Sequence, residues 1–393
     1  MKILFIAPYV PSRIRVRPFH IIKELSTRHS VHVLALGEPG KGRAGEEELA
    51  CRVDDFRIIP HSKLRGLGQS LMALLTPIPM CAAYCWSRAM QAEIKRAIRV
   101  SDFDVVHIEH LRAAHFAKYC GDIPIVFDSV DCLAGLFGQM SVSKKNPIGK
   151  LVMLEEHLKL KRYEPKVVSS FQRTVITSES ECDALKAMKD TLRVDVVPNG
   201  VDTDYFAPTA AERLPHRIVF SGKMGYHPNA QAANWFAENV FTTLKQRYTD
   251  TEFIIVGSDP PANILKLREM PGVTVTGYVD DIRPYVDGSS VAVVPMQVAV
   301  GIQNKLLEAM AMGLPVVATP ISTRPLGENC PGVIKAGDYS GMIAEISRLF
   351  DDPASARDIG EQGRREVIRN FSWKSSVGKL EQIYEEATKD FQR

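Results

Sequence analysis

The first half of the chain alternates between short apolar runs and longer amphipathic stretches. Apolar and β-branched runs predict strands at residues 3–7, 30–36, 104–108, 124–127, 173–177 and 193–197. Between them, apolar positions recur at helical spacing and predict helices over 18–27, 90–99, 151–163 and 179–188. Strands alternating with helices indicate an α/β fold with a parallel, doubly wound sheet.

The same rhythm restarts in the second half. Strands are predicted at 217–221, 252–256, 273–276, 291–295 and 315–318, with helices over 230–247, 305–312 and 339–350. Residues 198–215 hold an Asn-Gly pair and three prolines, which is typical of a hinge. We therefore predict two Rossmann-like domains, 1–200 and 201–372, that face a cleft. An amphipathic helix over 373–393 is expected to pack back on the first domain.

Length and charge narrow the class of protein. The 393 residues exceed what one core usually serves, and 45% hydrophobic with 24% charged residues excludes a disordered chain. Residues 1–195 carry 29 Lys+Arg against 22 Asp+Glu, which indicates an anionic partner for the first half. No zinc-finger, RNP-like or basic-zipper pattern occurs, so nucleic acid is not predicted. The odd number of cysteines without a CxxC and the short first apolar run predict a cytoplasmic location.

The segment most informative about chemistry is Gly301-Ile-Gln-Asn-Lys-Leu-Leu-Glu308, which runs on into Ala-Met-Ala-Met-Gly-Leu-Pro-Val-Val317. It follows a predicted strand and opens a helix. Backbone N–H groups at a helix start, with a glycine that permits close approach, form a phosphate site. Lys305 adds a cation there, and Glu308 lies one turn on, where it can accept hydrogen bonds from vicinal hydroxyls such as those of a ribose. The alternative is an ordinary helix packed on a sheet.

This segment resembles the donor-binding helix of family 4 glycosyltransferases. Three further stretches agree with that family: Val197-Pro-Asn-Gly-Val-Asp202, Val219-Phe-Ser-Gly-Lys-Met224 and Gly277-Tyr-Val-Asp-Asp281. Within the family, the start of the segment is similar to exopolysaccharide- and PEP-CTERM-associated sugar transferases. The resemblance implies a GT-B fold, a nucleoside diphosphate sugar held mainly by the second domain, transfer without a metal, and retention of anomeric configuration.

The chain departs from the family pattern at three places. Val300 stands where the signature has its first Glu, Gly222-Lys223 replaces a Gly-Arg pair, and Pro11-Ser-Arg-Ile-Arg-Val-Arg17 replaces a glycine pair. The resemblance implies that the donor is bound by Gly222, Lys223, Asn229, Tyr278, Val279, Gly301, Ile302, Gln303, Asn304, Lys305 and Glu308. Candidates for contacts to acceptor or phosphate are Arg13, Arg15, Arg17 and His110.

The catalytic candidates lie in Phe127-Asp-Ser-Val-Asp131, directly after a predicted strand. Family members often carry a His-Asp pair here, and Val130 takes the position of the His. Asp131, with Asp128 as second choice, is expected to orient or deprotonate the acceptor hydroxyl. The alternative for both aspartates is capping of the next helix. Neither His107-Ile-Glu-His110 nor Asp202-Thr-Asp204 has a context that favours a metal, so no metal is expected.

Basic and apolar residues are interleaved between His61 and Val100, where Glu93 is the one acidic residue. The basic ones are Lys63, Arg65, Arg88, Lys95, Arg96 and Arg99, and the apolar ones include Leu64, Leu67, Leu71, Leu74, Leu75, Trp86 and Ile94. Residues 143–166 add seven more lysines and arginines. This composition favours peripheral contact with an anionic membrane, and Pro77 and Pro79 disfavour a transmembrane helix. The alternative is a solvated helix face.

Together these observations predict a retaining glycosyltransferase that uses a nucleoside diphosphate sugar as substrate and needs no cofactor. The expected acceptor is a glycan or a polyprenyl-diphosphate-linked glycan in exopolysaccharide synthesis, at the inner face of the cell membrane. Two alternatives stay open at this point: a GT-B nucleotide-sugar epimerase, and a sugar-nucleotide-binding subunit without catalysis.

Overall fold

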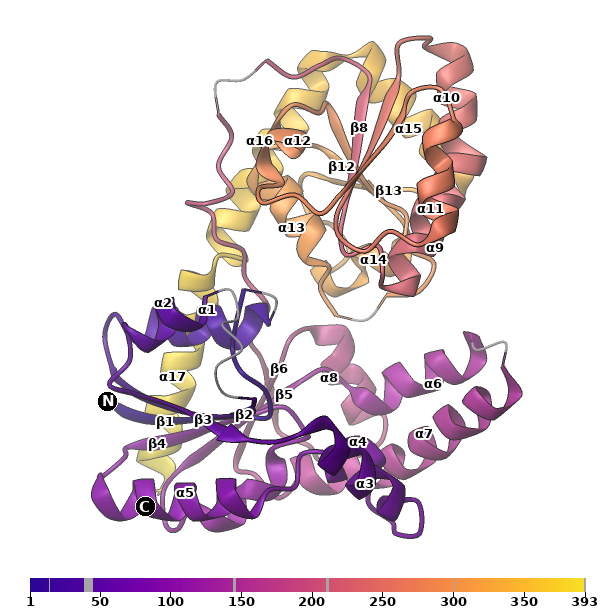
Figure 1. The fold of residues 1–393 in the computed structure, drawn as a ribbon. Coiled ribbons are helices and arrows are strands. Elements are labelled where there is room, and N and C mark those ends of the chain that lie inside the picture. Colours follow the sequence, from indigo (N-terminus) through magenta and orange to yellow (C-terminus); the bar gives the residue numbers. More distant parts are fainter. Residues whose placement is uncertain (14, 39–44, 144–145, 210–211, 300, 392–393) are drawn as a thin grey trace. The chain divides into compact units, whose positions relative to one another are not determined.

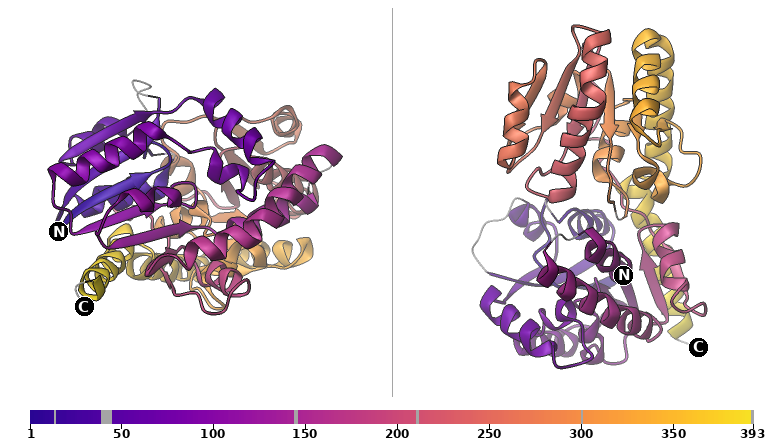
Figure 2. Two further views of the ribbon diagram at one scale, coloured as in Figure 1. Left: turned by 90° about the horizontal axis from the view of Figure 1, so that it is seen from below. Right: turned by 90° about the vertical axis from the view of Figure 1, so that its right-hand side faces the viewer.

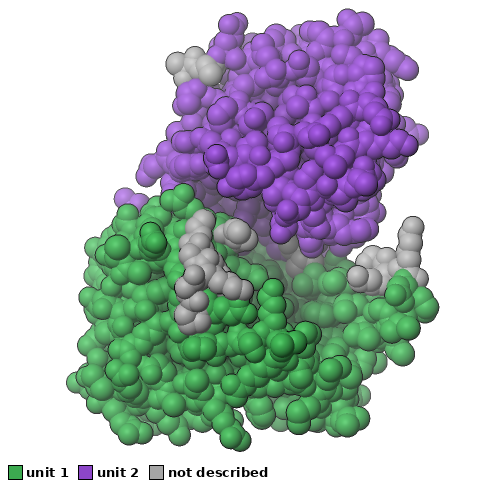
Figure 3. All heavy atoms as spheres, in the orientation of Figure 1, with its two compact units in different colours: residues 1–198, 376–393 green, residues 199–375 purple. Residues whose placement is uncertain are grey.

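The computed structural model describes the 393-residue chain except residues 14, 39–44, 144–145, 210–211, 300 and 392–393. The chain forms two compact units, shown in different colours in Figure 3. Unit 1 comprises Met1–Pro198 and Ser376–Arg393, and unit 2 comprises Asn199–Ser375. Each unit is built around a parallel sheet of its own.

Unit 1 contains a seven-stranded sheet in the order β3-β2-β1-β4-β5-β6-β7, and every strand pair is parallel. The strands are β1 (Lys2–Ala7), β2 (Ser30–Gly37), β3 (Asp55–Pro60), β4 (Val105–Glu109), β5 (Ile125–Val130), β6 (Arg173–Ile176) and β7 (Val194–Val196). The helices are α1 (Val16–Leu25), α2 (Glu46–Ala50), α3 (Lys63–Ala73), α4 (Met80–Ala83), α5 (Arg88–Val100), α6 (Leu133–Ser143), α7 (Pro147–Val168) and α8 (Glu179–Lys186). Figure 1 shows α1 and α5 on opposite faces of the sheet.

Unit 2 contains a six-stranded parallel sheet in the order β10-β9-β8-β11-β12-β13. The strands are β8 (Arg217–Ser221), β9 (Glu252–Val256), β10 (Val273–Gly277), β11 (Val291–Val294), β12 (Val316–Ala318) and β13 (Val333–Lys335). The helices are α9 (His227–Phe236), α10 (Thr242–Arg247), α11 (Ala262–Lys266), α12 (Arg283–Asp287), α13 (Asn304–Ala311), α14 (Pro320–Thr323), α15 (Tyr339–Asp351) and α16 (Pro353–Asn370). Helices cover both faces of this sheet (Figure 2).

The prediction of doubly wound parallel sheets is confirmed. One predicted helix differs: residues 230–247 are not a single α-helix, because a π-helical turn at Ala237–Phe241 separates α9 from α10. The sequence did not predict the edge strands β3 and β13, whose residues are only partly buried and so lack a clear apolar run. It also missed α6, whose first backbone N–H groups are satisfied by a distant glutamate rather than by a local capping residue.

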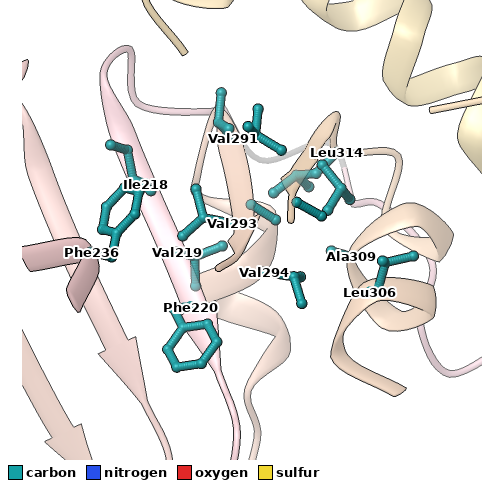
Figure 4. Close-up of a cluster of buried hydrophobic side chains, with 14 of the residues drawn as sticks. Ile218, Val219, Phe220, Phe236, Val291, Val293, Val294, Leu306, Ala309 and Leu314 are labelled. Atoms are coloured by element: carbon teal, nitrogen blue, oxygen red, sulfur yellow. The ribbon is translucent and has the colours of Figure 1, made fainter. Parts of the chain in front are cut away.

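The core of unit 2 positions helix α13 against the sheet. Figure 4 shows Ile218, Val219 and Phe220 of β8 and Val291, Val293 and Val294 of β11 packed with Leu306 and Ala309 of α13. Because Leu306 and Ala309 are buried against the strands, Lys305 and Glu308 are held at a fixed angle beside the same core. Hydrophobic packing thus sets the orientation of Lys305 and Glu308, the two charged residues of α13 that are predicted to bind the donor.

Helix α17 (Trp373–Phe391) begins in unit 2 and belongs to unit 1 from Ser376 onward. Tyr384 is fully buried there, and its hydroxyl forms a 2.8 Å hydrogen bond with His107 Nδ1 on β4. Arg28 pairs with Glu381 at 2.9 Å, and Arg173 pairs with Glu386 and Asp390. The helix is therefore attached to unit 1 along its length by one buried and several exposed polar contacts.

Candidate functional site

The order of strands in unit 2 locates a crevice beside β8. The chain runs from β8 outward through β9 to β10 and then returns to β11 on the other side of β8. The loops that leave β8 and β11 consequently diverge, and ligands of open α/β sheets bind at such a switch point, beyond the carboxyl ends of the strands. Gly222 directly follows β8, and Gly301 lies in the segment between β11 and α13, which begins at Asn304. The predicted donor residues lie on both sides of the switch point.

Three of these residues converge on one spot. Gly222 has φ +150°, and a Cβ placed on it would lie 2.9 Å from Asn229 Nδ2 and 3.1 Å from Lys305 Cε. A side chain there would fill the space between the loop after β8 and the start of α13. Gly257, which follows β9 with φ +145°, approaches so closely that a Cβ would overlap the Gly222 carbonyl. The glycines at these two neighbouring strand ends therefore let their loops pack closely against each other, beside Asn229 and Lys305.

Asn229 holds the loop after β8. Its Nδ2 donates a 2.9 Å hydrogen bond to the Lys223 carbonyl, while its buried Oδ1 has no protein partner among the described residues. Asn229 thus anchors the backbone of Lys223. The Lys223 side chain is largely exposed and forms a 3.2 Å ion pair with Asp259. An exposed pair of this kind contributes little to stability, so Lys223 can exchange Asp259 for a ligand phosphate at small cost.

Lys305 and Glu308 are the charged residues of α13 that border this spot. Lys305 Nζ lies 3.3 Å from Gln303 Oε1 and 5.8 Å from the centre of the Phe220 ring. Burial lowers the pKa of Lys305 to about 8, and the charge of Glu308 opposes this shift. Burial likewise raises the pKa of Glu308 to about 7, against the charge of Lys305. Such perturbed groups mark candidate functional sites because each charged form lacks solvation that a ligand can replace.

The remaining predicted donor residues surround the same edge. Tyr278 is exposed directly after β10, and Val279 packs against the core beside it. Gly301 has φ +62°, Ile302 is buried, Gln303 precedes α13 without capping it through its side chain, and Asn304 is the first helical residue. Val300, where the family signature has its first Glu, lies outside the described residues.

Unit 1 has a corresponding switch point between β1 and β4. Tyr9 and the arginines of residues 13–17 follow β1, His110 follows β4, and Asp128 and Asp131 lie at the end of β5. The structure therefore also gathers the predicted acceptor and catalytic candidates at the carboxyl edge of one sheet. Their environments differ widely.

Arg17 and Asp128 form a buried ion pair. Arg17 Nε donates to Asp128 Oδ2 at 2.8 Å, and Arg17 NH1 donates to the Val197 carbonyl at 3.0 Å. Asp128 Oδ1 accepts the Val130 N–H at 3.0 Å, so this aspartate closes the turn after β5. Both side chains are committed to joining β5, α1 and the segment after β7. We therefore expect neither residue to contact the substrate directly.

Asp131 has a different setting. Helix α6 does not use it as a cap, because the N–H groups of Leu133 and Ala134 donate to Glu164 and the Cys132 N–H donates to Glu181. The capping interpretation of Asp131 is therefore wrong. Burial raises the pKa of Asp131 to about 7, the charges of Glu181 and Asp128 add to this, and Arg17 opposes it. A carboxyl group with this pKa can exchange a proton near neutral pH.

Two residues beside Asp131 hold left-handed backbone conformations. His110 has φ +69° and Val130 has φ +66°, at the ends of neighbouring strands. This conformation is costly for a β-branched residue, and such strain concentrates at functional sites. Burial, with Arg112 and Arg15 nearby, lowers the pKa of His110 to about 3, so its imidazole is neutral. Its Nδ1 accepts the Arg112 N–H at 3.2 Å.

Sequence reasoning missed Tyr9 and Glu109 as members of this cluster. The Tyr9 hydroxyl donates to Glu109 Oε1 at 3.0 Å, and the Arg15 guanidinium lies 4.5 Å from the centre of the Tyr9 ring. Burial and the charge of Asp128 raise the pKa of Glu109 to about 8. Arg13 is exposed and pairs with Glu48 at 3.1 Å. Their positions in the sequence could have indicated this cluster, because Tyr9 comes just after one strand and Glu109 ends the neighbouring strand of the sheet.

No group of three or more His, Cys, Asp or Glu side chains in the described part of the chain is placed to hold a metal ion. Among the helices that the structure describes, none combines the length and the apolar character required to cross a membrane.

Comparisons with known proteins agree with the sequence resemblance. Residues 16–205 match the family model described as Glycosyltransferase Family 4, and residues 215–352 match the one described as Glycosyl transferases group 1. The MMP alpha-(1->4)-mannosyltransferase of Mycolicibacterium hassiacum is 27% identical over 206 residues, which cover 50% of this chain and 49% of that protein. The UDP-Gal:alpha-D-GlcNAc-diphosphoundecaprenol alpha-1,3-galactosyltransferase of Escherichia coli is 25% identical over 223 residues, covering 50% and 54%.

These alignments span about half the length of each curated relative. A similarity over the whole chain comes from solved structures. Sucrose-phosphate synthase from Thermosynechococcus elongatus has a TM-score of 0.70 at 15% identity, covering 98% of this chain and 99% of that one. The likeness shows that the two proteins share a fold.

Proposed function

The chain belongs to the family 4 glycosyltransferases and has the GT-B fold, and on this premise we propose that it transfers a sugar from a nucleoside diphosphate sugar to a lipid-linked or free glycan. The transfer retains the anomeric configuration and needs no metal. The product belongs to an exopolysaccharide or a related cell-surface polysaccharide. The observation that carries the proposal is the convergence of Gly222, Asn229 and Lys305 at the switch point of unit 2.

The donor binds in unit 2 through its nucleotide. Its diphosphate lies at the start of α13 beside Gly222, where Lys305 and Lys223 supply positive charge. Glu308 accepts hydrogen bonds from the ribose hydroxyls, and Tyr278 and Val279 offer a surface to the base. Gly222 and Gly257 allow the loops at this edge to pack closely beside the cation of Lys305.

The acceptor binds in unit 1, with its reacting hydroxyl at Asp131. In the transfer, the bond between the sugar's anomeric carbon and the donor phosphate breaks, and a bond from that carbon to the acceptor oxygen forms on the same face of the sugar, as retention requires. The acceptor proton passes to the Asp131 carboxylate, and the nucleoside diphosphate leaves with the bonding electrons. Lys305 and Lys223 stabilise the negative charge that develops on the leaving phosphate.

A polyprenyl-diphosphate-linked glycan is the acceptor that we favour. One relative of this chain is named as acting on a sugar diphosphoundecaprenol. In this chain, Arg15 near the acceptor edge offers an exposed guanidinium suited to a phosphate. Such a lipid would place the protein at the inner face of the cell membrane.

The test is a panel of nucleotide sugars incubated with the full chain, with and without polyprenyl-diphosphate-linked acceptors. We expect one donor to release nucleoside diphosphate in step with glycosylated acceptor, without added metal and in the presence of a chelator. A donor that is epimerised instead would identify an epimerase. Donors that bind but release nothing with any acceptor would identify a binding subunit. The anomeric configuration of the product, determined by NMR, tests retention.

A further inference from the structure

We propose that the outer faces of α3 and α7 form one lipid-docking surface that places unit 1 on an anionic bilayer. This deepens the proposed function by naming the surface through which the protein meets the membrane of a lipid-linked acceptor. The contact itself follows from the exposed side chains of unit 1 and is measurable without any sugar transfer.

Helix α3 carries an apolar stripe that faces solvent. The stripe comprises Leu64, Leu67, Leu71, Met72, Leu74 and Leu75, and the exposed fractions reach 84% at Leu64 and 94% at Leu75. The opposite side of the helix is packed: a Cβ on Gly66 would lie 2.5 Å from the Tyr84 ring, and Ala73 is buried. The orientation of α3 is therefore fixed with its leucines outward.

Helix α7 repeats this arrangement. Ile148, Leu151, Leu154 and Leu158 recur every three or four residues and are exposed, with 73% at Ile148. The buried side of α7 carries Glu156, Leu160 and Glu164. A helix of a soluble surface normally turns its apolar stripe to the core and its charges to water. Here two neighbouring helices present apolar stripes to water.

Polar contacts hold α3 and α7 together. Lys159 of α7 donates to the Ala73 and Leu74 carbonyls at the end of α3, at 2.9 and 3.3 Å. Glu156 of α7 accepts the N–H groups of Met80 and Cys81 at the start of α4, both at 2.8 Å. Figure 1 shows α3, α4 and α7 close to one another in unit 1. Exposed Trp86 follows α4, and its carbonyl accepts from Gln69 of α3 at 2.9 Å.

The charges around the stripes are those of a surface that binds anions. Residues 61–92 contain no Asp or Glu, and neither do residues 132–154. Lys63 and Arg65 are exposed on either flank of the α3 stripe, and Lys150, Lys161 and Arg162 are exposed on α7. Of the three glutamates of α7, Glu155 pairs with Lys159, while Glu156 and Glu164 are buried against backbone N–H groups. Lys144 and Lys145 lie outside the described residues.

This combination matches a bilayer better than a second copy of the chain. In a two-fold symmetric dimer the same surface meets itself, so lysines and arginines would face lysines and arginines without acidic partners. An anionic lipid surface supplies the opposite charge, while leucine and tryptophan side chains enter the boundary between headgroups and acyl chains. Basic residues at the flanks extend their charged ends to the phosphates.

The experiment is flotation of the full chain with vesicles of phosphatidylcholine alone or mixed with phosphatidylglycerol, at low and high salt. We expect binding to the anionic vesicles that weakens as salt rises. The paired change Leu71→Gln with Leu75→Gln, and separately Leu151→Gln with Leu158→Gln, should each weaken binding at least about tenfold, because each removes two anchors. Lys63→Glu with Arg65→Glu should weaken binding at least about tenfold as well.

Matched controls come from unit 2. Leu265→Gln with Ile368→Gln removes two exposed apolar side chains, and Lys266→Glu with Arg369→Glu reverses two exposed charges. Both control variants should bind vesicles as the original chain does. No flotation with anionic vesicles, or equal losses in the control variants, would overturn the proposal. A dimer that light scattering detects and that Leu71→Gln with Leu75→Gln dissociates, without vesicle binding, would show that the surface joins two copies and would also overturn it.

Calorimetric binding of UDP and GDP to the same samples separates this proposal from the proposed function. A chain that binds a nucleotide but ignores vesicles contradicts only the lipid surface. A chain that floats with vesicles but binds neither nucleotide contradicts only the donor site. The α3 and α7 variants should keep their nucleotide affinity and their thermal unfolding midpoint, because the altered side chains are exposed.

Discussion

The carboxyl edges of the two sheets follow the same topology but are built in opposite ways. In unit 2 the edge depends on glycines that permit close packing: the missing Cβ of Gly257 makes room for the Gly222 carbonyl, and Gly222 lies beside Asn229 and Lys305. In unit 1 the edge is filled by side chains that bind one another. There, Arg17 pairs with Asp128, and Tyr9 donates to Glu109.

The difference extends to the charges. Lys305 and Glu308 of unit 2 are a cation and an acid whose pKa values of about 8 and about 7 both reflect missing solvation. In unit 1, burial raises the pKa of Glu109 to about 8 and that of Asp131 to about 7. At the first edge the acid lies beside a lysine whose charge opposes the rise of its pKa, whereas at the second edge the charge of Asp128 adds to the rise of the pKa of both acids. This contrast supports donor binding in unit 2 and proton transfer in unit 1.

The largest effect is expected at Asp131. Asp131→Asn keeps the shape of the side chain but removes the proton acceptor, so turnover should fall by about 10²–10⁴. Nucleotide affinity should be unchanged, because the nucleotide is held by unit 2. Steady-state rates with a matched donor and acceptor, together with calorimetry of the nucleoside diphosphate, measure both quantities. Asp183→Asn on α8 is the matched control, since Asp183 is an exposed acid of the same unit.

Normal turnover in the Asp131→Asn variant would exclude Asp131 as the base. The pH profile gives a second test. The original chain should lose activity as pH falls below about 7, because Asp131 then becomes protonated. An acid limb that is unchanged in the variant would assign this titration to another group.

A large effect on stability is expected at Asp128. Asp128→Asn leaves the buried Arg17 charge without its partner, which typically costs about 3–5 kcal/mol of unfolding free energy. Arg13→Ala breaks the exposed pair with Glu48 and should cost no more than about 1 kcal/mol. Denaturant unfolding measures both values. Equal, small losses would show that Arg17 and Asp128 do not form the framework of this edge.

Much of the fold could be predicted because the buried parallel strands are nearly continuous apolar runs. β8 and β9 are found where the sequence placed them, since Ile218–Phe220 and Phe253–Val256 have few polar interruptions. The edge strand β3 reads Asp-Phe-Arg-Ile-Ile-Pro and is only partly buried, so its pattern is ambiguous. Helix α6 depends on Glu164, which is thirty residues away from Ala134, and no local signal reveals such a cap.

The candidate site, like the fold, could be predicted where it depends on local sequence and could not where it depends on contacts between distant residues. The sequence predicted that Gly222 follows a strand and that Lys305 and Glu308 lie at a helix start, and the structure places them there; their role in donor binding stays a prediction. The roles of Arg17 and Asp128 were not predictable, because their partnership joins residues that are 111 positions apart. Tyr9 and Glu109 escaped notice for the same reason: their hydrogen bond joins residues 100 positions apart. Long-range pairing therefore distinguishes Arg17, which is buried in α1, from Arg13 and Arg15, which precede the helix and are exposed.

An intermediate effect is expected at Glu308. Glu308→Ala removes the acceptor for the ribose hydroxyls, and losing one partner of a buried charge-assisted hydrogen bond typically costs about 2–5 kcal/mol. Nucleoside diphosphate affinity should fall at least tenfold, in line with this energy. Glu361→Ala on α16 is the control, since Glu361 is exposed. Unchanged affinity in the Glu308→Ala variant would remove Glu308 from the donor site.

The smallest effect is a pH dependence of nucleotide affinity at Lys305. The pKa of Lys305 is lowered to about 8, and only its protonated form attracts the diphosphate, so affinity should decline as pH rises above about 8. The decline should approach tenfold per pH unit at most, because one proton is involved. Lys305→Arg keeps the positive charge at every accessible pH, so its affinity should stay level from pH 8 to 9, above the pKa of about 7 of Glu308. Lys245→Arg, on α10 of the same unit, should retain the original profile. Calorimetry of UDP and GDP across this range measures the slope. An alkaline decline that persists in Lys305→Arg would mean that another group titrates. Lys305 would then not be the cation that distinguishes the edge of unit 2 from that of unit 1.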